Sequence, residues 1–172
     1  LGKQGGPLFL HGFTTVAPYI VNAQQLVEIQ EYFTNKKIDH WEKRLVPIKC
    51  TFNTIRPLLH MRMDILQNEG PLKTFPHQLS FLKFARKANE WKAFEQFYDI
   101  HFTSSDIDKI NRLQKLQLDY EYLHLLRKKV TIEASFNFLD SCLTTPPKNN
   151  GEKEIFSKFY FKKAKWIARC HK

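Results

Sequence analysis

Residues 105–129 carry two apolar seams at helical spacing, and few folds can accommodate both. The first seam contains Ile110, Leu113, Leu116, Tyr120 and Leu123. The second contains Ile107, Leu118, Tyr122 and Leu125. Apolar residues that recur every three or four positions mark one buried face of a helix. A helix with two such faces must be packed on two sides, so we expect residues 105–129 to form one central helix among others.

The rest of the chain predicts further helices and no clear strand. Apolar spacing and turn residues place them at 22–33, 57–67, 76–102, 131–143 and 155–172. Residues 76–102 form either one long helix buried on two sides or a helical hairpin that turns near Asn89. Residues 38–53 are better interpreted as extended, although Pro47 excludes a central strand. The predicted fold is mostly α, an irregular helical bundle or short helical array with an extended N-terminal arm.

Glycine and proline positions suggest the domain organisation. Four of the six glycines lie in residues 1–21, together with Pro7 and Pro18, and predict the extended N-terminal arm. Residues 22–143 form the predicted helical domain. Residues 144–152, which contain Pro146, Pro147 and Gly151, form the predicted linker. Residues 153–172 form a basic amphipathic C-terminal helix.

The C-terminal helix sorts its residues into two faces when they are placed at about 100° per residue. Residues 155–172 hold six Lys or Arg residues and no Asp or Glu. The apolar face is predicted to contact a partner through Phe156, Phe159, Tyr160 and Trp166. The same face can instead dock on this domain's own core, lie in a membrane interface or fill a partner's groove. The sequence leaves these alternatives open.

Positive charge falls into three blocks of a chain whose net charge is +10. Residues 36–62, 109–129 and 155–172 carry +5, +4 and +6. Basic surfaces of this kind attract nucleic acid, anionic lipid or acidic proteins, although such charge can also simply be solvated. The residues predicted to bind a nucleic acid or another anionic surface are Lys36, Lys37, Lys43, Arg44, Arg127, Lys128, Lys129, Lys158, Lys162, Lys165, Arg169 and Lys172.

Catalytic motifs do not emerge from the glycine-rich or apolar N-terminal stretches. The apolar run that ends in His11-Gly12 resembles the oxyanion-loop strand of α/β-hydrolases, but that fold also needs a G-x-S-x-G nucleophile turn, which the chain lacks. Residues 2–6 combine glycines with Lys3 without the order of a phosphate-binding loop. These observations predict no small-molecule substrate and no cofactor.

Acidic and histidine residues are equally poor candidates for a metal or catalytic site. Asp106 with Asp108, and Asp119 with Glu121, are spaced by two residues, which points their carboxylates about 200° apart on a helix. The seven histidines share no H-x-x-x-H spacing. If the protein were an enzyme, the neighbouring pair of His40 and Asp39 would be the first residues to test. We therefore expect no metal and no catalytic residue.

Cys50, Cys142 and Cys170 are odd in number and far apart. Free thiols without a C-x-x-C motif are typical of a reducing intracellular compartment. The mitochondrial matrix is one such compartment, and it would agree with the basic charge and with a chain that starts at Leu1 after removal of a targeting peptide. No run of 18 apolar residues is present, so no membrane span is predicted.

Together these features favour a non-enzymatic protein. We expect a basic accessory or scaffold subunit of a large assembly, most simply a ribonucleoprotein such as an organellar ribosome. It would contact RNA phosphates and neighbouring subunits. Two alternatives fit the same sequence: an accessory subunit of a membrane-bound complex, for example a mitochondrial one, and a helical protein–protein adaptor.

Overall fold

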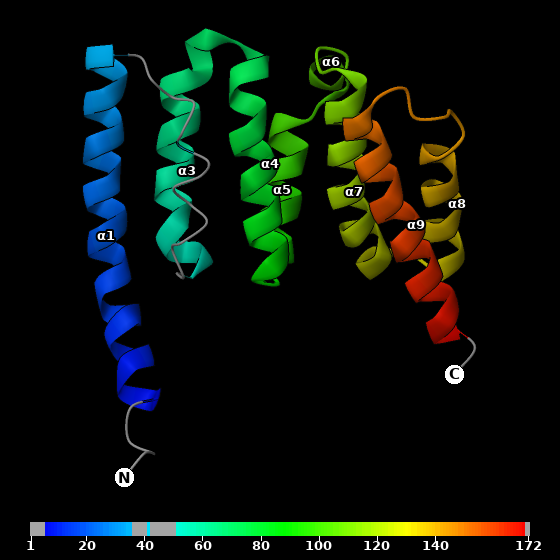
Figure 1. The fold of residues 1–172 in the computed structure, drawn as a ribbon, viewed down its shortest axis with the longest axis horizontal. Helices are drawn as coiled ribbons and strands as arrows, with labels where there is room; N and C mark the ends of the chain where they lie inside the picture. Colours follow the sequence, from blue (N-terminus) through cyan, green and yellow to red (C-terminus); the bar gives the residue numbers. More distant parts are fainter. Residues whose placement is uncertain (1–5, 36–40, 42–50, 171–172) are drawn as a thin grey trace. The chain divides into compact units, whose positions relative to one another are not determined.

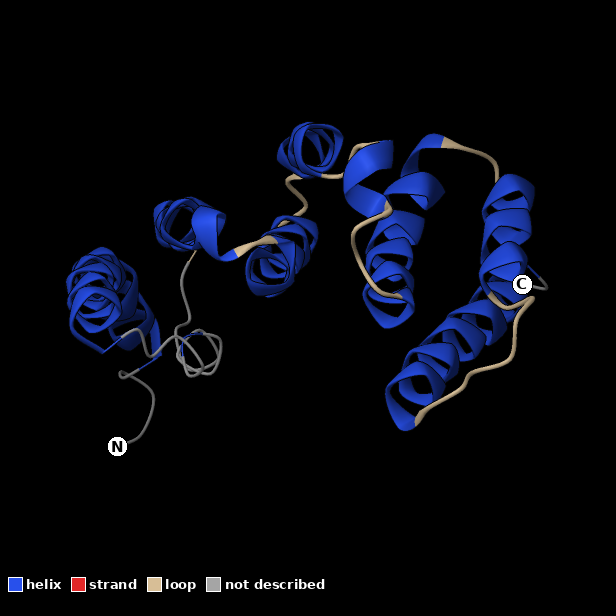
Figure 2. Cartoon of the chain, turned by 90° about the horizontal axis from the view of Figure 1, so that it is seen from above, coloured by secondary structure: helices blue, strands red, loops and turns tan. Residues whose placement is uncertain are grey.

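The described parts of the chain are entirely helices and the loops that join them. The computed structural model describes residues 6–35, 41 and 51–170, with the side chains of residues 18–34, 41 and 51–169. No β-strand occurs in these ranges, so the predicted mostly α helical array is confirmed (Figures 1 and 2). In chain order the elements are α1 (Gly6–Asn35), α3 (Phe52–Leu66), the 3-10 turn η1 (Gln67–Glu69), α4 (Pro71–Lys87), α5 (Trp91–His101), α6 (Ser104–Ile107), α7 (Arg112–Lys129), α8 (Ile132–Cys142) and α9 (Asn150–Cys170).

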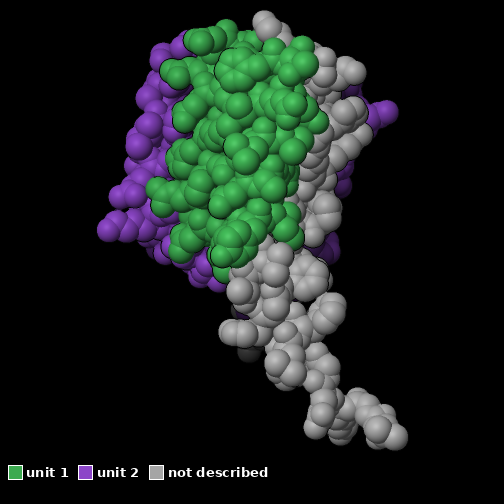
Figure 3. Space-filling model, turned by 90° about the vertical axis from the view of Figure 1, so that its left-hand side faces the viewer, with its two compact units in different colours: residues 1–84 green, residues 85–172 purple. Residues whose placement is uncertain are grey.

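The helices divide between two compact units. Unit 1 comprises residues 1–84 and unit 2 comprises residues 85–172 (Figure 3). The boundary falls inside α4 and inside residues 22–143, which the sequence treated as one helical domain.

Helix α1 packs on α3 in unit 1 and replaces most of the predicted extended arm. The prediction was wrong for residues 6–21 because glycine and proline were taken as helix breakers. Gly lowers helix stability by only about 1 kcal/mol, and Pro7 lies in the first turn, where its missing N–H costs nothing. Pro18 lies inside the helix.

A buried ion pair joins α1 to α3. The Arg62 guanidinium donates to both carboxylate oxygens of Glu28, at 2.7 and 2.5 Å, and both side chains are fully buried. The Arg62 guanidinium carbon also lies 5.7 Å from the centre of the Trp41 ring, a cation–π distance. The pair fixes one register of α1 on α3, since each charge would be left without compensation in any other.

The sequence predicted that two helices begin at or near a proline, but both prolines lie inside longer helices. Helix α3 begins at Phe52 instead of Pro57, and α4 begins at Pro71 instead of near Pro76. An internal proline removes one backbone hydrogen bond. In α3 the burial of Phe52 and Ile55, whose side chains lie in the core, offsets that loss.

Residues 76–102 adopt the hairpin alternative. Helix α4 ends at Lys87 and α5 starts at Trp91. Asn89 takes φ of 60°, the left-handed conformation that Asn tolerates better than most residues. The predicted turn near Asn89 is therefore confirmed.

Residues 105–129 form two helices instead of one. Helix α6 ends at Ile107, and α7 starts at Arg112 behind a capping box. The Asn111 side chain accepts from the Gln114 backbone N–H at 2.9 Å, and the Gln114 side chain accepts from the Asn111 N–H at 3.0 Å. The apolar pattern gave no sign of this break, because Ile107 and Ile110 continue the helical spacing across it.

The core of unit 2 lies among α7, α8 and α9. Its buried members are Leu116, Leu123, Leu139, Ile155, Phe156, Phe159 and Trp166. Aromatic rings make edge contacts between the helices, as Phe136 of α8 does with Trp166 of α9 at 5.8 Å. The predicted helix 131–143 is confirmed as α8, and α7 packs on α5 and α8 as well as α9, as its two apolar seams require.

Candidate anionic-ligand surface in unit 2

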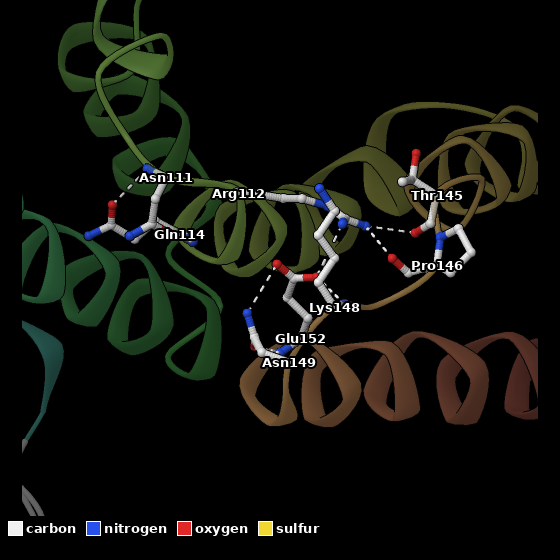
Figure 4. Close-up of polar contacts among 8 residues, drawn as sticks. All are labelled: Asn111, Arg112, Gln114, Thr145, Pro146, Lys148, Asn149 and Glu152. Carbon is white, nitrogen blue, oxygen red and sulfur yellow. Dashed lines mark hydrogen bonds and ion pairs between the residues drawn. The ribbon is translucent and has the colours of Figure 1, made fainter.

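The position of α9 is set where the chain enters it, at a cluster of polar contacts (Figure 4). Asn149 accepts from the Glu152 backbone N–H at 2.9 Å, and Glu152 accepts from the Lys148 N–H at 2.8 Å. Arg112, in the first turn of α7, donates to the carbonyl oxygens of Thr145 and Pro146 and lies 3.2 Å from the Glu152 carboxylate. Helix α9 therefore starts at Asn150, inside the predicted linker 144–152.

Helix α9 runs parallel to α7. Near their N-terminal ends, a Cβ added to Gly151 would lie 2.9 Å from Leu113 Cδ2. One seven-residue step further along α7, the Tyr120 and Phe159 rings are 5.4 Å apart. Another seven residues on, the Arg127 guanidinium carbon lies 6.0 Å from the Trp166 ring centre. The C-terminal turns of the two helices therefore lie at the same end of unit 2.

This parallel packing gathers positive charge. Arg127 lies in the last turn of α7, and α9 carries Lys162, Lys165 and Arg169 along its last turns. Arg86, in the last turn of α4, joins them. We call these five residues the basic end of unit 2. Burial, followed by the charges of Arg86, Lys165 and Arg169, lowers the pKa of Lys162 below its ordinary value, so these three cations lie close enough to act on its ammonium group.

One buried acid, Glu121, pairs with a member of the basic end. The Glu121 carboxylate accepts from Arg86 Nε at 2.6 Å, and Glu121 is buried. His124, one turn further along α7, stays neutral because burial and the charges of Lys162 and Arg86 lower its pKa to about 3. By contrast, Lys165 and Arg169 make no ion pair with any described residue and are exposed. The basic end therefore holds unneutralised charge at the surface.

Other predicted basic residues of α7 and α9 are engaged elsewhere in unit 2. Lys129 pairs with Glu95 of α5, and the Lys128 ammonium lies 5.6 Å from the Trp91 ring centre. Lys158 pairs with Glu154 at 2.7 Å within α9. All three stay exposed, so they can add to the field of the surface without belonging to the basic end.

The four aromatic residues predicted to contact a partner separate into two groups. Phe156, Phe159 and Trp166 are buried in the core of unit 2, so α9 docks on its own unit through them. Tyr160 is 57% exposed. Phe161, which the sequence did not single out, is 70% exposed.

Several predicted residues lie outside the described part of the chain. These are Lys36, Lys37, Lys43, Arg44, Lys172, His40, Asp39 and Cys50, with most of the segment 38–53. Arg86 is the opposite case, a member of the basic end that sequence reasoning missed. Its only signal was its place beside Lys87 at a helix C-terminus, where cations are common.

The acidic pairs do not assemble a metal site. Asp106 accepts from Thr103 and pairs with Lys109 at 3.2 Å, while Glu121 is held by Arg86. Burial raises the pKa of Asp119 to about 6. No group of three or more His, Cys, Asp or Glu side chains suited to a metal ion occurs among the described residues.

None of the described helices has the length and apolar character needed to cross a membrane. Comparisons of the chain with protein-family models, curated proteins and solved structures find no match. The basic end of unit 2 must therefore be interpreted from its own geometry and charge.

Proposed function

We propose that the protein is a non-enzymatic basic accessory or scaffold subunit of a large assembly, and that the basic end of unit 2 contacts the phosphates of an RNA. The observation that carries this proposal is the parallel packing of α7 on α9, which collects Arg127, Lys162, Lys165 and Arg169 at one end. A ribonucleoprotein such as an organellar ribosome is the assembly that best suits such a subunit.

The chemistry of the surface suits a polymer backbone better than a small anion. The charged groups extend over the ends of three helices and are not enclosed around one point. Lys and Arg on such a surface neutralise phosphates and release counterions, which gives affinity without reading bases. Arg86 is already paired with Glu121, so the other four residues of the basic end would give a slope of log K against log salt of about −2.8 on a single strand.

We place this function in a reducing compartment, with the mitochondrial matrix as one option. Cys142 is a free thiol, and burial raises its pKa to about 12. A thiol that stays protonated and half-buried reacts slowly, which suits a packing role.

Purification of the full chain from its native cells, with and without nuclease, tests the proposal. We expect RNA and several basic proteins to co-purify, and nuclease to release them. A nuclease-resistant complex with one protein or with membrane proteins would contradict an RNA-contacting role.

A protein–protein adaptor is the second candidate, and helix α1 favours it. Tyr19, Leu26 and Phe33 recur every seven residues on α1 and are largely exposed. Exposed apolar residues in register are typical of a helix that pairs with another. Partner binding that is insensitive to salt and lost in a Leu26→Asp variant would favour the adaptor.

A further inference from the structure

Helix α9 carries an exposed apolar strip that its packing in unit 2 leaves uncovered. The strip consists of Tyr160, Phe161, Ala164, Ile167 and Ala168, all of which are exposed. Its Tyr160 and Ile167 edge adjoins the buried Phe156, and the strip extends from there around α9, away from Phe159 and Trp166, to Phe161. The strip spans nine residues, or about 13 Å of helix.

The strip has the shape of a helix-packing surface, with small side chains along its centre and large ones at its edges. At about 100° per residue, Phe161 lies on one edge, and Tyr160 and Ile167 lie on the other. Ala164 and Ala168 lie between them, so small side chains are flanked by large ones. Side-chain ridges of a second helix pack into such a groove, and alanine at the centre allows the two axes to approach closely.

One edge of the strip is positively charged. Lys158, Lys165 and Arg169 follow the Phe161 edge at helical spacing. Lys165 and Arg169 make no ion pair with any described residue. On the opposite edge, Lys163 is already neutralised by Asp140 of α8 at 2.5 Å. The charge available to a ligand is therefore on one edge only.

We propose that the apolar strip binds an amphipathic helix of another protein, one that carries Asp or Glu along a single edge. Such a helix would place its apolar side on Ala164 and Ala168 and its acids opposite Lys165 and Arg169, because Lys158 already pairs with Glu154. Charges that flank an apolar seam in this way set partner choice and orientation in helix pairs.

Three other occupants fit the strip less well. A second copy of this chain has no Asp or Glu in residues 155–172 to pair with Lys165 and Arg169, and in an antiparallel arrangement it would bring its own basic edge against the first. A membrane surface favours large side chains that project, whereas this strip is lowest at its centre. An RNA would gain stacking on Tyr160 and Phe161, but their directions on the helix differ by about 100°, so they form no common platform.

The proposal does not depend on RNA binding by the basic end, although Lys165 and Arg169 border both surfaces. It can be tested with substitutions that leave every charge in place. Phe161→Ser removes the largest exposed ring of the strip. Ile100→Ser is a matched control, because Ile100 is 69% exposed on α5 and belongs to neither proposed binding surface.

The probes are two labelled helical peptides with the same Leu and Ala face, one edged with Glu and the other with Lys at the same positions. Fluorescence anisotropy with the full chain should show the Glu-edged peptide binding at least about tenfold more tightly. Phe161→Ser should weaken it by about tenfold or more, the loss typical of a large aromatic contact residue, whereas Ile100→Ser should not. Poly-U affinity should be unchanged in Phe161→Ser, which separates this proposal from RNA binding.

Several results would overturn the proposal. One is equal affinity for the two peptides, or no binding of either. Another is Glu-edged peptide binding that survives Phe161→Ser. Binding to phosphatidylserine vesicles that Phe161→Ser abolishes, or a chain dimer in sedimentation that it dissolves, would assign the strip to a membrane or to a second copy.

Discussion

Glu28 and Arg62 are fully enclosed in unit 1 and depend on each other for compensation of charge. Glu28→Gln removes the negative partner and leaves the Arg62 cation buried, with its Nη1 already lacking a hydrogen-bond partner among the described residues. We expect a loss of about 3–5 kcal/mol in the free energy of unfolding. Urea unfolding followed by circular dichroism measures it.

The matched control replaces both residues. Glu28→Leu combined with Arg62→Met removes the two charges together and keeps similar volume, so it should cost clearly less than Glu28→Gln alone. Equal losses in the two variants would mean that the pair acts through packing and not through charge. A loss of under about 1 kcal/mol in Glu28→Gln would place Arg62 in contact with water, against the structure.

Helix α9 depends on the residue that precedes it. Asn149 caps the Glu152 N–H, so Asn149→Ala should lower the free energy of unfolding by about 1 kcal/mol. Asn150→Ala changes the same residue type one position later, where the side chain makes no hydrogen bond with the described residues. The two variants should differ in urea midpoint, and coincident midpoints would contradict the cap.

Helices were predictable where apolar spacing is long and regular, as in α7, α8 and α9. The ends of these helices were harder to predict, because a helix cap depends on a single polar residue. Asn111 and Asn149 start two helices, yet nothing in their neighbourhood distinguishes them from linker asparagines until Gln114 and Glu152 are recognised as capping partners.

The candidate surface was predictable only in part. The sequence identifies Arg127, Lys162, Lys165 and Arg169 as basic residues on helices. The sequence does not show whether α9 packs parallel or antiparallel to α7. That direction decides whether the basic ends of the two helices meet. Nor does the sequence separate the buried Phe159 from the exposed Tyr160, since helical spacing assigns both to the apolar face.

At the scale of the whole molecule, stability should fall below neutral pH. Burial lowers the pKa of His77 to about 4 and that of His124 to about 3, so the unfolded chain takes up two protons that the folded chain refuses as pH falls below about 6.5. Asp119, with its pKa raised to about 6, opposes this with one proton between about pH 4 and 6. The histidines therefore dominate.

We expect the free energy of unfolding to be about 2 kcal/mol lower at pH 5 than at pH 7.5 in urea titrations. His124→Gln, which cannot take up the proton, should show a smaller difference between the two pH values. Stability that is constant or higher at pH 5 would mean that these histidines are solvated in the folded chain.

The most direct test of RNA binding by the basic end is the salt dependence of poly-U affinity. Lys165→Gln with Arg169→Gln removes two of its charges, and Lys73→Gln with Lys83→Gln removes two exposed charges of unit 1. We expect the slope of log K against log salt to become shallower by about 1.4 in the first variant and to stay unchanged in the second. Equal slopes for both variants and the unaltered chain, or no poly-U binding at low salt, would contradict it.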